Sequence, residues 1–215
     1  VRRAALGIIR TILANNLKLD LALLVNEALI LLPIAKQEGS LADKIKNTAS
    51  SVVSKFSGLV TGEIYNFFIQ RLIIYLSDKY KKNVLEACAS SRNPLFDLTD
   101  YVKRVEVISK LNSPELLENA NRVIRILKED SKKQVKPELF RESAESELYS
   151  KIASIKETDD YSGYLNSLED MNGTVQKFFN DVLVMDKDEN VKENRLALLT
   201  LLKSKYNYIA DFSKL

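Results

Sequence analysis

Apolar side chains recur every three or four residues along most of this chain, and this period limits how the chain can fold more than any other feature. The C-terminal segment shows it best, with apolar positions at Leu198, Leu201, Leu202, Ile209 and Phe212. Side chains at this spacing share one face of an α-helix. No stretch of any length alternates apolar and polar residues as a half-buried strand does. Glycine and proline number only 6 and 4 among 215 residues, which argues against turn-rich all-β folds. The sequence therefore predicts an all-α, multi-helix bundle.

Local signals predict where individual helices begin. Asp20 and Ser113 belong to the residue types that cap helix N-termini, and Pro114 suits the first helical position. Asp97 or Thr99 can cap the helix before that one. The helices that we expect end near residue 15 and then span about 21–32, 41–80, 84–89, 99–111 and 114–129, with later ones that start near 137, flank 172–173 and run over 190–212. The loop at 90–94, with the sequence SSRNP, predicts an internal boundary that divides the chain into 1–92 and 93–215.

Histidine is absent, and Cys88 is the only cysteine. The chain thus lacks the most common general base and metal ligand, and it cannot form an internal disulfide or a cysteine zinc cluster. Cys88 is either a small apolar filler of the core or a reactive thiol. Neither a P-loop nor a dinucleotide-binding motif occurs. We therefore expect no catalytic residue, no cofactor-binding residue and no metal ligand in this chain, and a reducing compartment.

The most apolar stretch, Leu21–Ala35, is interrupted by Asn26 and Glu27 and broken at Pro33, so it predicts no membrane span. The chain begins with Val1 rather than Met and shows no secretory leader. These features predict a segment of a longer, cytoplasmic protein.

The net charge is modest, +3, and unevenly distributed, since residues 1–90 hold 12 Lys and Arg residues but only 7 Asp and Glu residues. So small an excess does not attract nucleic acid over the whole surface, and any such contact must be local. Arg122, Arg125, Lys132 and Lys133 lie near one face of the helix expected to start at Pro114. Guanidinium groups suit phosphate oxygens and stack on unpaired bases. A solvated helix face is the alternative interpretation of such a stripe.

Six short segments, taken in order, resemble one known family. They are RRAALGIIR at 2–10, FFIQRLIIYL at 67–76, NRVIRIL at 121–127, FFNDVLVM at 178–185, NRLALL at 194–199 and ADFSKL at 210–215. On these segments the chain resembles the C-terminal region of the bacterial-type glycyl-tRNA synthetase β subunit. It departs from the usual pattern of that family at Gln176 and Asn180, which replace Asp, and at Asn121 and Arg125, which replace Lys and Asn.

The resemblance implies a fold, an activity and partners. It implies that 1–92 is a helical connecting region and that 93–215 is a DALR-like anticodon-binding helical bundle. The whole enzyme would be an α2β2 glycine–tRNA ligase, in which the α subunit uses ATP, Mg and glycine and the β subunit binds glycine tRNA. The chain would then recognise the anticodon and position the tRNA for aminoacylation on the α subunit, with neither DNA nor a membrane as a partner.

The residues that we expect to bind nucleic acid are Lys103, Arg104, Arg122, Arg125, Arg195 and Arg71. Arg195 has a second interpretation, because it can form an ion pair with an acidic residue of the segment 186–189 instead of contacting RNA. The pair Phe178–Phe179 can likewise stack an anticodon base or belong to the core.

A second function remains open beside tRNA binding. The chain could be a helical scaffold without an RNA role that docks a protein partner through an apolar groove. Added salt weakens binding to phosphates strongly and docking of apolar surfaces much less, so the response to salt separates the two functions.

Overall fold

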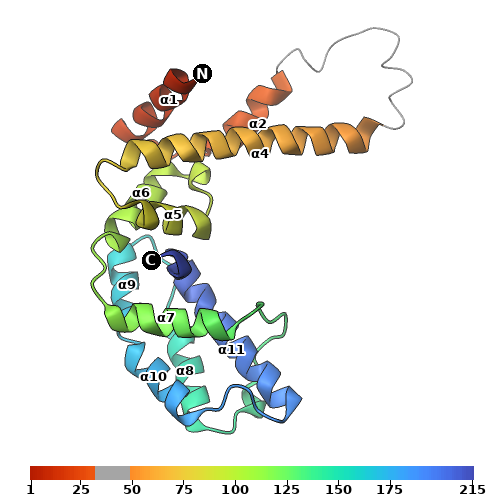
Figure 1. Ribbon diagram of the computed structural model, residues 1–215, viewed down its shortest axis with the longest axis vertical. Helices are drawn as coiled ribbons and strands as arrows, with labels where there is room; N and C mark the ends of the chain where they lie inside the picture. Colours follow the sequence, from red (N-terminus) through yellow and green to blue (C-terminus); the bar gives the residue numbers. More distant parts are fainter. Residues whose placement is uncertain (32–48) are drawn as a thin grey trace. The chain divides into compact units, whose positions relative to one another are not determined.

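The computed structural model describes residues 1–31 and 49–215, and the side chains of 1–28 and 61–215. All regular elements of this part of the chain are helical (Figure 1), which confirms the all-α prediction. The α-helices are α1 (Arg2–Ala14), α2 (Leu21–Leu31), α4 (Ala49–Leu76), α5 (Lys82–Ser91), α6 (Leu98–Ile108), α7 (Pro114–Ile126), α8 (Ser143–Ser154), α9 (Tyr161–Glu169), α10 (Asn172–Asp181) and α11 (Glu189–Asn207). Three short 3-10 turns, η2 (Pro94–Phe96), η3 (Pro137–Leu139) and η4 (Phe212–Lys214), complete the described elements. The predicted helix end at Pro33 and the first part of the predicted helix 41–80 lie outside the described residues.

The elements form two compact units. The first unit comprises Val1–Lys79 and Asn93–Val102, and the second comprises Tyr80–Arg92 and Lys103–Leu215. Each unit takes residues from both sides of position 92, so the division of the chain into 1–92 and 93–215 stays a prediction.

In the first unit α1 packs against α4, and Ile9 and Leu72 are fully buried. Asp20 caps α2 as the sequence predicts, because its carboxylate accepts a hydrogen bond of 2.8 Å from the N–H of Leu23. The hydroxyl of Tyr65 on α4 donates to the carbonyl of Ala22 at 2.9 Å and fixes α2 against the long helix.

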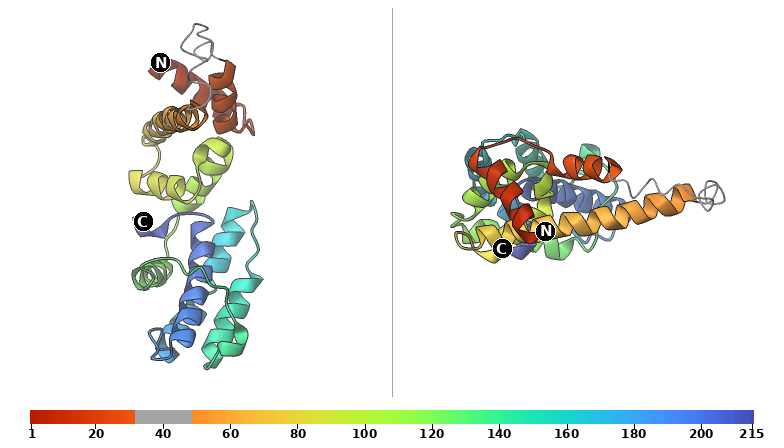
Figure 2. Two further views of the ribbon diagram at one scale, coloured as in Figure 1. Left: turned by 90° about the vertical axis from the view of Figure 1, so that its right-hand side faces the viewer. Right: turned by 90° about the horizontal axis from the view of Figure 1, so that it is seen from above.

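The second unit is built around α7, α8, α10 and α11, which pack on one another. Figure 2 shows α8 and α11 side by side. The core holds Leu116, Leu148 and Leu198, together with Phe178, all without exposed surface. Phe179 is only 7% exposed, so the interpretation of the two phenylalanines as core residues is confirmed.

Several helix boundaries differ from those predicted, since α4 ends at Leu76 rather than near 80 and α11 ends at Asn207 rather than near 212. Two further differences flank the stretch between α7 and α8. The helix α7 ends at Ile126 rather than near 129, and Pro137 starts only a 3-10 turn. The next helix begins at Ser143 because the carboxylate of Glu145 accepts hydrogen bonds from the N–H groups of Arg141 and Glu142, at 2.8 and 2.9 Å. A side chain that accepts hydrogen bonds from the first free N–H groups of a helix favours the start of the helix at that residue.

Three contacts anchor the stretch between α7 and α8, which contains only one 3-10 turn, to α11. The side-chain amide of Asn194 accepts from the N–H of Lys136 at 2.7 Å and donates to its carbonyl at 3.0 Å. The hydroxyl of Thr200 accepts from the N–H of Ser131 at 3.0 Å. Lys203 forms an ion pair of 2.7 Å with Asp130. The position of this stretch is therefore determined by side chains of a helix that lies about sixty residues further along the chain.

Replacing Asn194 with alanine should lower the free energy of unfolding by about 1–3 kcal/mol, because the two polar groups of Lys136 lose their partner and Asn194 is only 4% exposed. Chemical denaturation measures the change. Asn190→Ala on the same helix, whose side chain is exposed, is the matched control and should stay within about 0.5 kcal/mol of the unchanged chain. Equal stabilities of the two variants would contradict the anchoring role of Asn194.

Candidate nucleic-acid interface

The helix α7 presents two arginines to solvent. It begins where the sequence predicts, with Ser113 as the N-cap and Pro114 at the first helical position. The apolar face of the helix is buried in the second unit, which leaves Arg122 and Arg125 on the exposed face. They lie three residues apart, about 5–6 Å between their Cβ atoms, so they form one surface. We call these two residues the α7 arginine pair.

The α7 arginine pair has no acidic partner among the residues that the structure describes. Arg125 donates only to the carbonyl of Asn121 on its own helix, through Nε at 3.3 Å. The guanidinium carbon of Arg122 lies 4.2 Å from the centre of the Phe179 ring, on α10. Both groups thus keep N–H donors for a ligand, which is the main requirement for binding phosphate.

The predicted basic stripe is shorter than expected. Lys132 and Lys133 follow the end of α7 at Ile126 and do not continue its exposed face. The amine of Lys133 also lies 3.8 Å from the carboxylate of Glu193. The stripe prediction is therefore wrong for these two lysines and holds for the α7 arginine pair alone.

Lys103 and Arg104 are neighbours on α6 with opposite surroundings. Lys103 is exposed, whereas Arg104 has no exposed surface. One terminal nitrogen of Arg104 donates to the carbonyls of Cys88 and Ile209, at 2.8 and 3.2 Å, and to the hydroxyl of Ser91, at 3.0 Å. Arg104 therefore joins two chain segments inside the unit, and its prediction as an RNA contact is corrected. Consecutive residues of a helix point about 100° apart, so one can be buried while the next is exposed.

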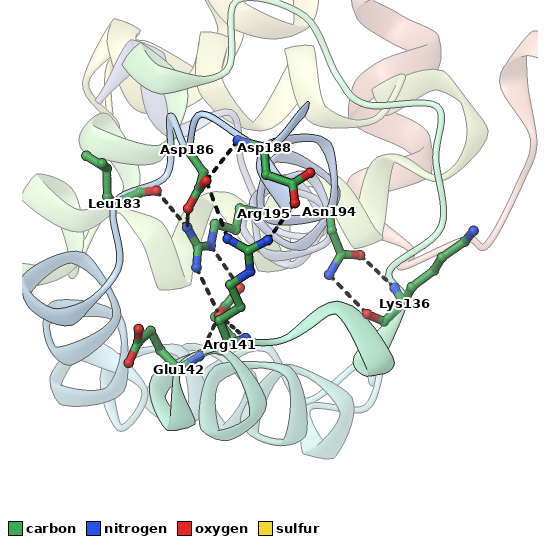
Figure 3. Close-up of polar contacts among 9 residues, drawn as sticks. Lys136, Arg141, Glu142, Leu183, Asp186, Asp188, Asn194 and Arg195 are labelled. Atoms are coloured by element: carbon green, nitrogen blue, oxygen red, sulfur yellow. Dashed lines mark hydrogen bonds and ion pairs between the residues drawn. The ribbon is translucent and has the colours of Figure 1, made fainter. Parts of the chain in front are cut away.

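Arg195 is also buried, with 3% of its surface exposed, and it joins three segments of the second unit (Figure 3). Its Nε and one terminal nitrogen donate to the two carboxylate oxygens of Glu145, at 2.9 and 3.3 Å. The other terminal nitrogen donates to the carboxylate of Asp186 and to the carbonyl of Leu183, at 2.8 and 2.9 Å. The ion-pair interpretation of Arg195 is confirmed for Asp186, and its assignment to RNA is corrected.

This ion-pair cluster shifts the pKa values of its members. Burial by itself raises the pKa of Glu145, but hydrogen bonds from Arg195 and from two backbone N–H groups outweigh burial and lower it. The pKa of Asp186 is lowered chiefly by the hydrogen bond from the N–H of Asp188 and further by Arg195. Both carboxylates are therefore charged at neutral pH and neutralise Arg195. The sequence did not indicate Glu145, because it lies fifty residues from Arg195.

Arg71 belongs to the first unit and is half-buried. Its guanidinium carbon lies 5.0 Å from the centre of the Phe67 ring, one turn earlier on α4. The structure thus brings Arg122 and Arg125 together on α7, places Lys103 elsewhere in the same unit, and does not place Arg71 with them.

Cys88 is buried without exposed surface, which confirms its interpretation as a core residue.

An open pocket of about 450 Å³ lies in the second unit beside α11. Its cations are used inside the chain: Lys203 pairs with Asp130, and Arg92 donates to the carbonyl of Tyr208 at 3.1 Å and lies over the ring of that residue. The pocket therefore offers a less available positive charge than the α7 arginine pair.

The described residues contain no group of acidic, cysteine or histidine side chains arranged to hold a metal ion. None of the described helices is long and apolar enough to cross a bilayer.

Part of the second unit matches a known protein family. Residues 116–206, from α7 to α11, match the DALR anticodon binding domain, and this part of the chain belongs to that family. The whole chain is also 34% identical, over 224 residues, to the glycine–tRNA ligase β subunit of Geotalea daltonii. The chain is also 34% identical to the β subunit of Geotalea uraniireducens and 28% identical to that of Persephonella marina, in both cases over the full length of the chain. The chain spans about 30% of the length of these relatives. The predicted resemblance to the C-terminal region of glycyl-tRNA synthetase β subunits is thereby confirmed.

Proposed function

We propose that this chain is the part of a glycine–tRNA ligase β subunit that recognises the anticodon of glycine tRNA. The observation that supports it best is the α7 arginine pair, exposed and without an acidic partner among the described residues, inside a segment that matches an anticodon-binding family. In this proposal the N–H groups of Arg122 and Arg125 bind phosphates of the anticodon arm, with Lys103 as a further cation of the same unit. Because the net charge is only +3, these few residues supply most of the attraction.

The proposal extends to the whole enzyme by resemblance. The chain would belong to a cytoplasmic α2β2 assembly in which the α subunit uses ATP and Mg to activate glycine. The β subunit would hold the tRNA so that its acceptor end reaches that active site. No chemical step is assigned to the residues of this chain, and its contribution is binding energy and position.

The affinity of the chain for glycine tRNA, and for the same tRNA with a replaced anticodon, tests the proposal at low and at moderate salt. We expect tighter binding of the natural anticodon and a steep loss of affinity as salt is added, because phosphate binding releases counterions. Equal binding of both tRNAs would reduce the surface to a nonspecific RNA contact. No binding at low salt would contradict the proposal and favour the scaffold that docks an apolar partner.

A further inference from the structure

Arg122 is held on an aromatic ring that is itself fixed in the core. The Phe179 ring is 7% exposed and packs edge-to-face on Phe178, with ring centres 5.4 Å apart and planes at 70°. Phe178 has no exposed surface, so the position of the Phe179 ring is determined by the core. The guanidinium carbon of Arg122 lies 4.2 Å from the centre of the Phe179 ring, within stacking distance.

The guanidinium group of Arg122 is thus in contact with a ring and still accessible to a ligand. The guanidinium carbon lies over the Phe179 ring, and Arg122 as a whole is exposed to solvent. A guanidinium group is planar and delocalised, and RNA-binding proteins use such planes to stack unpaired bases. Holding the group on a fixed ring also reduces the side-chain entropy that binding would otherwise cost. The N–H edge of the same group remains available for a phosphate, so stacking and phosphate binding do not compete.

Two exposed amide side chains lie close to Phe179 in the sequence of α10. Gln176 and Asn180 are both exposed and lie one helical turn apart. Gln176 is three residues before Phe179, and Asn180 directly follows it. Amide side chains both donate and accept, so they suit the mixed donor and acceptor edge of a base. Lys177 between them is engaged by Glu147 in an ion pair of 2.6 Å and adds little free charge.

We propose that Arg122, supported by Phe179, is a stacking platform for one unpaired base of single-stranded RNA, with Gln176 and Asn180 beside the edge of that base. The inference rests on the proposed function and adds a contact that depends on the face of a base and not on phosphate charge. The two phenylalanines thus belong to the core and still act on RNA, because Phe179 acts through the arginine that lies on it.

The experiment measures the affinity of the chain for the anticodon stem-loop of glycine tRNA and for a set of the same stem-loops, each lacking one base of the loop. Arg122→Lys keeps the charge and removes the plane. It should weaken binding of the intact loop by about five- to thirtyfold and leave the dependence on salt unchanged. With one particular base removed, the variant and the unchanged chain should bind equally, because that base is the one that stacks.

A second variant tests the support of the plane. Phe179→Leu removes the ring and keeps an apolar side chain, and it should show the same dependence on that one base. Circular dichroism checks that this variant folds, and Arg122→Lys alone decides the question if it does not. An Arg122→Lys variant that binds as tightly as the unchanged chain would overturn the stacking platform, and so would an equal loss on every stem-loop. The proposed function fails separately, if reversing the charge of both arginines leaves tRNA binding unchanged.

Discussion

Replacing Glu145 with alanine is expected to lower the free energy of unfolding of the second unit by about 3–5 kcal/mol. The change removes both carboxylate oxygens that bind Arg195 and leaves a buried positive charge. It also removes the acceptor for the N–H groups of Arg141 and Glu142 at the start of α8. We expect the lower end of the range, because Arg195 keeps Asp186 and the carbonyl of Leu183. Denaturant unfolding followed by circular dichroism measures the loss.

The matched control is Glu147→Ala, two residues further along the same helix. Glu147 pairs with Lys177, but both side chains are 45% exposed. An exposed pair contributes at most about 1 kcal/mol, so this variant should lose little stability. Similar losses of unfolding free energy in the two variants would show that the buried pair of Glu145 and Arg195 stabilises the unit no more than an exposed pair does.

Acid should weaken the Glu145 pair in a defined range of pH. The pKa of Glu145 is lower in the folded chain than in the unfolded one, so its contribution to stability is complete above the ordinary pKa of an unfolded glutamate. The contribution is lost as the pH falls through the lower, folded pKa. The difference in stability between the unchanged chain and Glu145→Ala should therefore be constant from neutral pH to about pH 5 and shrink in stronger acid. A difference that grows on acidification would contradict the direction of the shift.

Reversing the charge of the α7 arginine pair, with Arg122→Glu and Arg125→Glu together, is expected to weaken tRNA binding by about tenfold or more for each residue. Each position loses a hydrogen bond to a charged group, and a repulsive carboxylate takes its place. The plot of log affinity against log salt should also become less steep, by about 0.7–0.9 for each phosphate that the variant no longer binds. Titration of labelled glycine tRNA at several salt concentrations gives both quantities.

The control for this prediction changes the net charge equally at two paired lysines. In Lys177→Glu with Lys192→Glu, both replaced side chains form ion pairs within the chain, with Glu147 and Glu189. This variant should bind tRNA more tightly than the α7 double variant. If both variants lose the same affinity and the same salt dependence, net charge explains the result and the α7 arginine pair is not a specific contact.

The helices were predictable because their causes are local. The caps at Asp20 and Ser113 each act on the N–H group three residues away, and the apolar period of α11 is visible in the sequence itself. The end of α7 at Ile126 was not predictable, because the stretch that follows it is held by anchors such as Asn194 and Thr200, which approach only when the unit folds. The late start of α8 has a local cause, the carboxylate of Glu145, which the pattern of apolar residues does not indicate.

The candidate site was predictable in kind but not residue by residue. The resemblance led to the right family, and spacing selected Arg122 and Arg125. Nothing in the spacing separates these two from Arg104 and Arg195, which are buried among carbonyls and carboxylates of distant segments. Whether an arginine faces solvent is a property of the packed unit, because some of its partners, such as Ile209 for Arg104 and Glu145 for Arg195, come from about fifty to a hundred residues away. The stack of Arg122 on Phe179 has the same origin.

Arginine and lysine side chains differ in burial in the part of the chain that the structure describes. Arg104 and Arg195 are buried, whereas no lysine with a described side chain is buried. A guanidinium group can satisfy several acceptors at once and is weakly hydrated, so it can serve inside the unit, where an ammonium group would lose its water. Amine-directed acylation should therefore modify the described lysines without opening the core, except at Lys203, whose ion pair with Asp130 anchors the stretch between α7 and α8. Arginine-directed dicarbonyl reagents should instead modify residues in two kinetic classes, fast at Arg122 and Arg125 and slow at the two buried guanidinium groups, whose modification requires the unit to open.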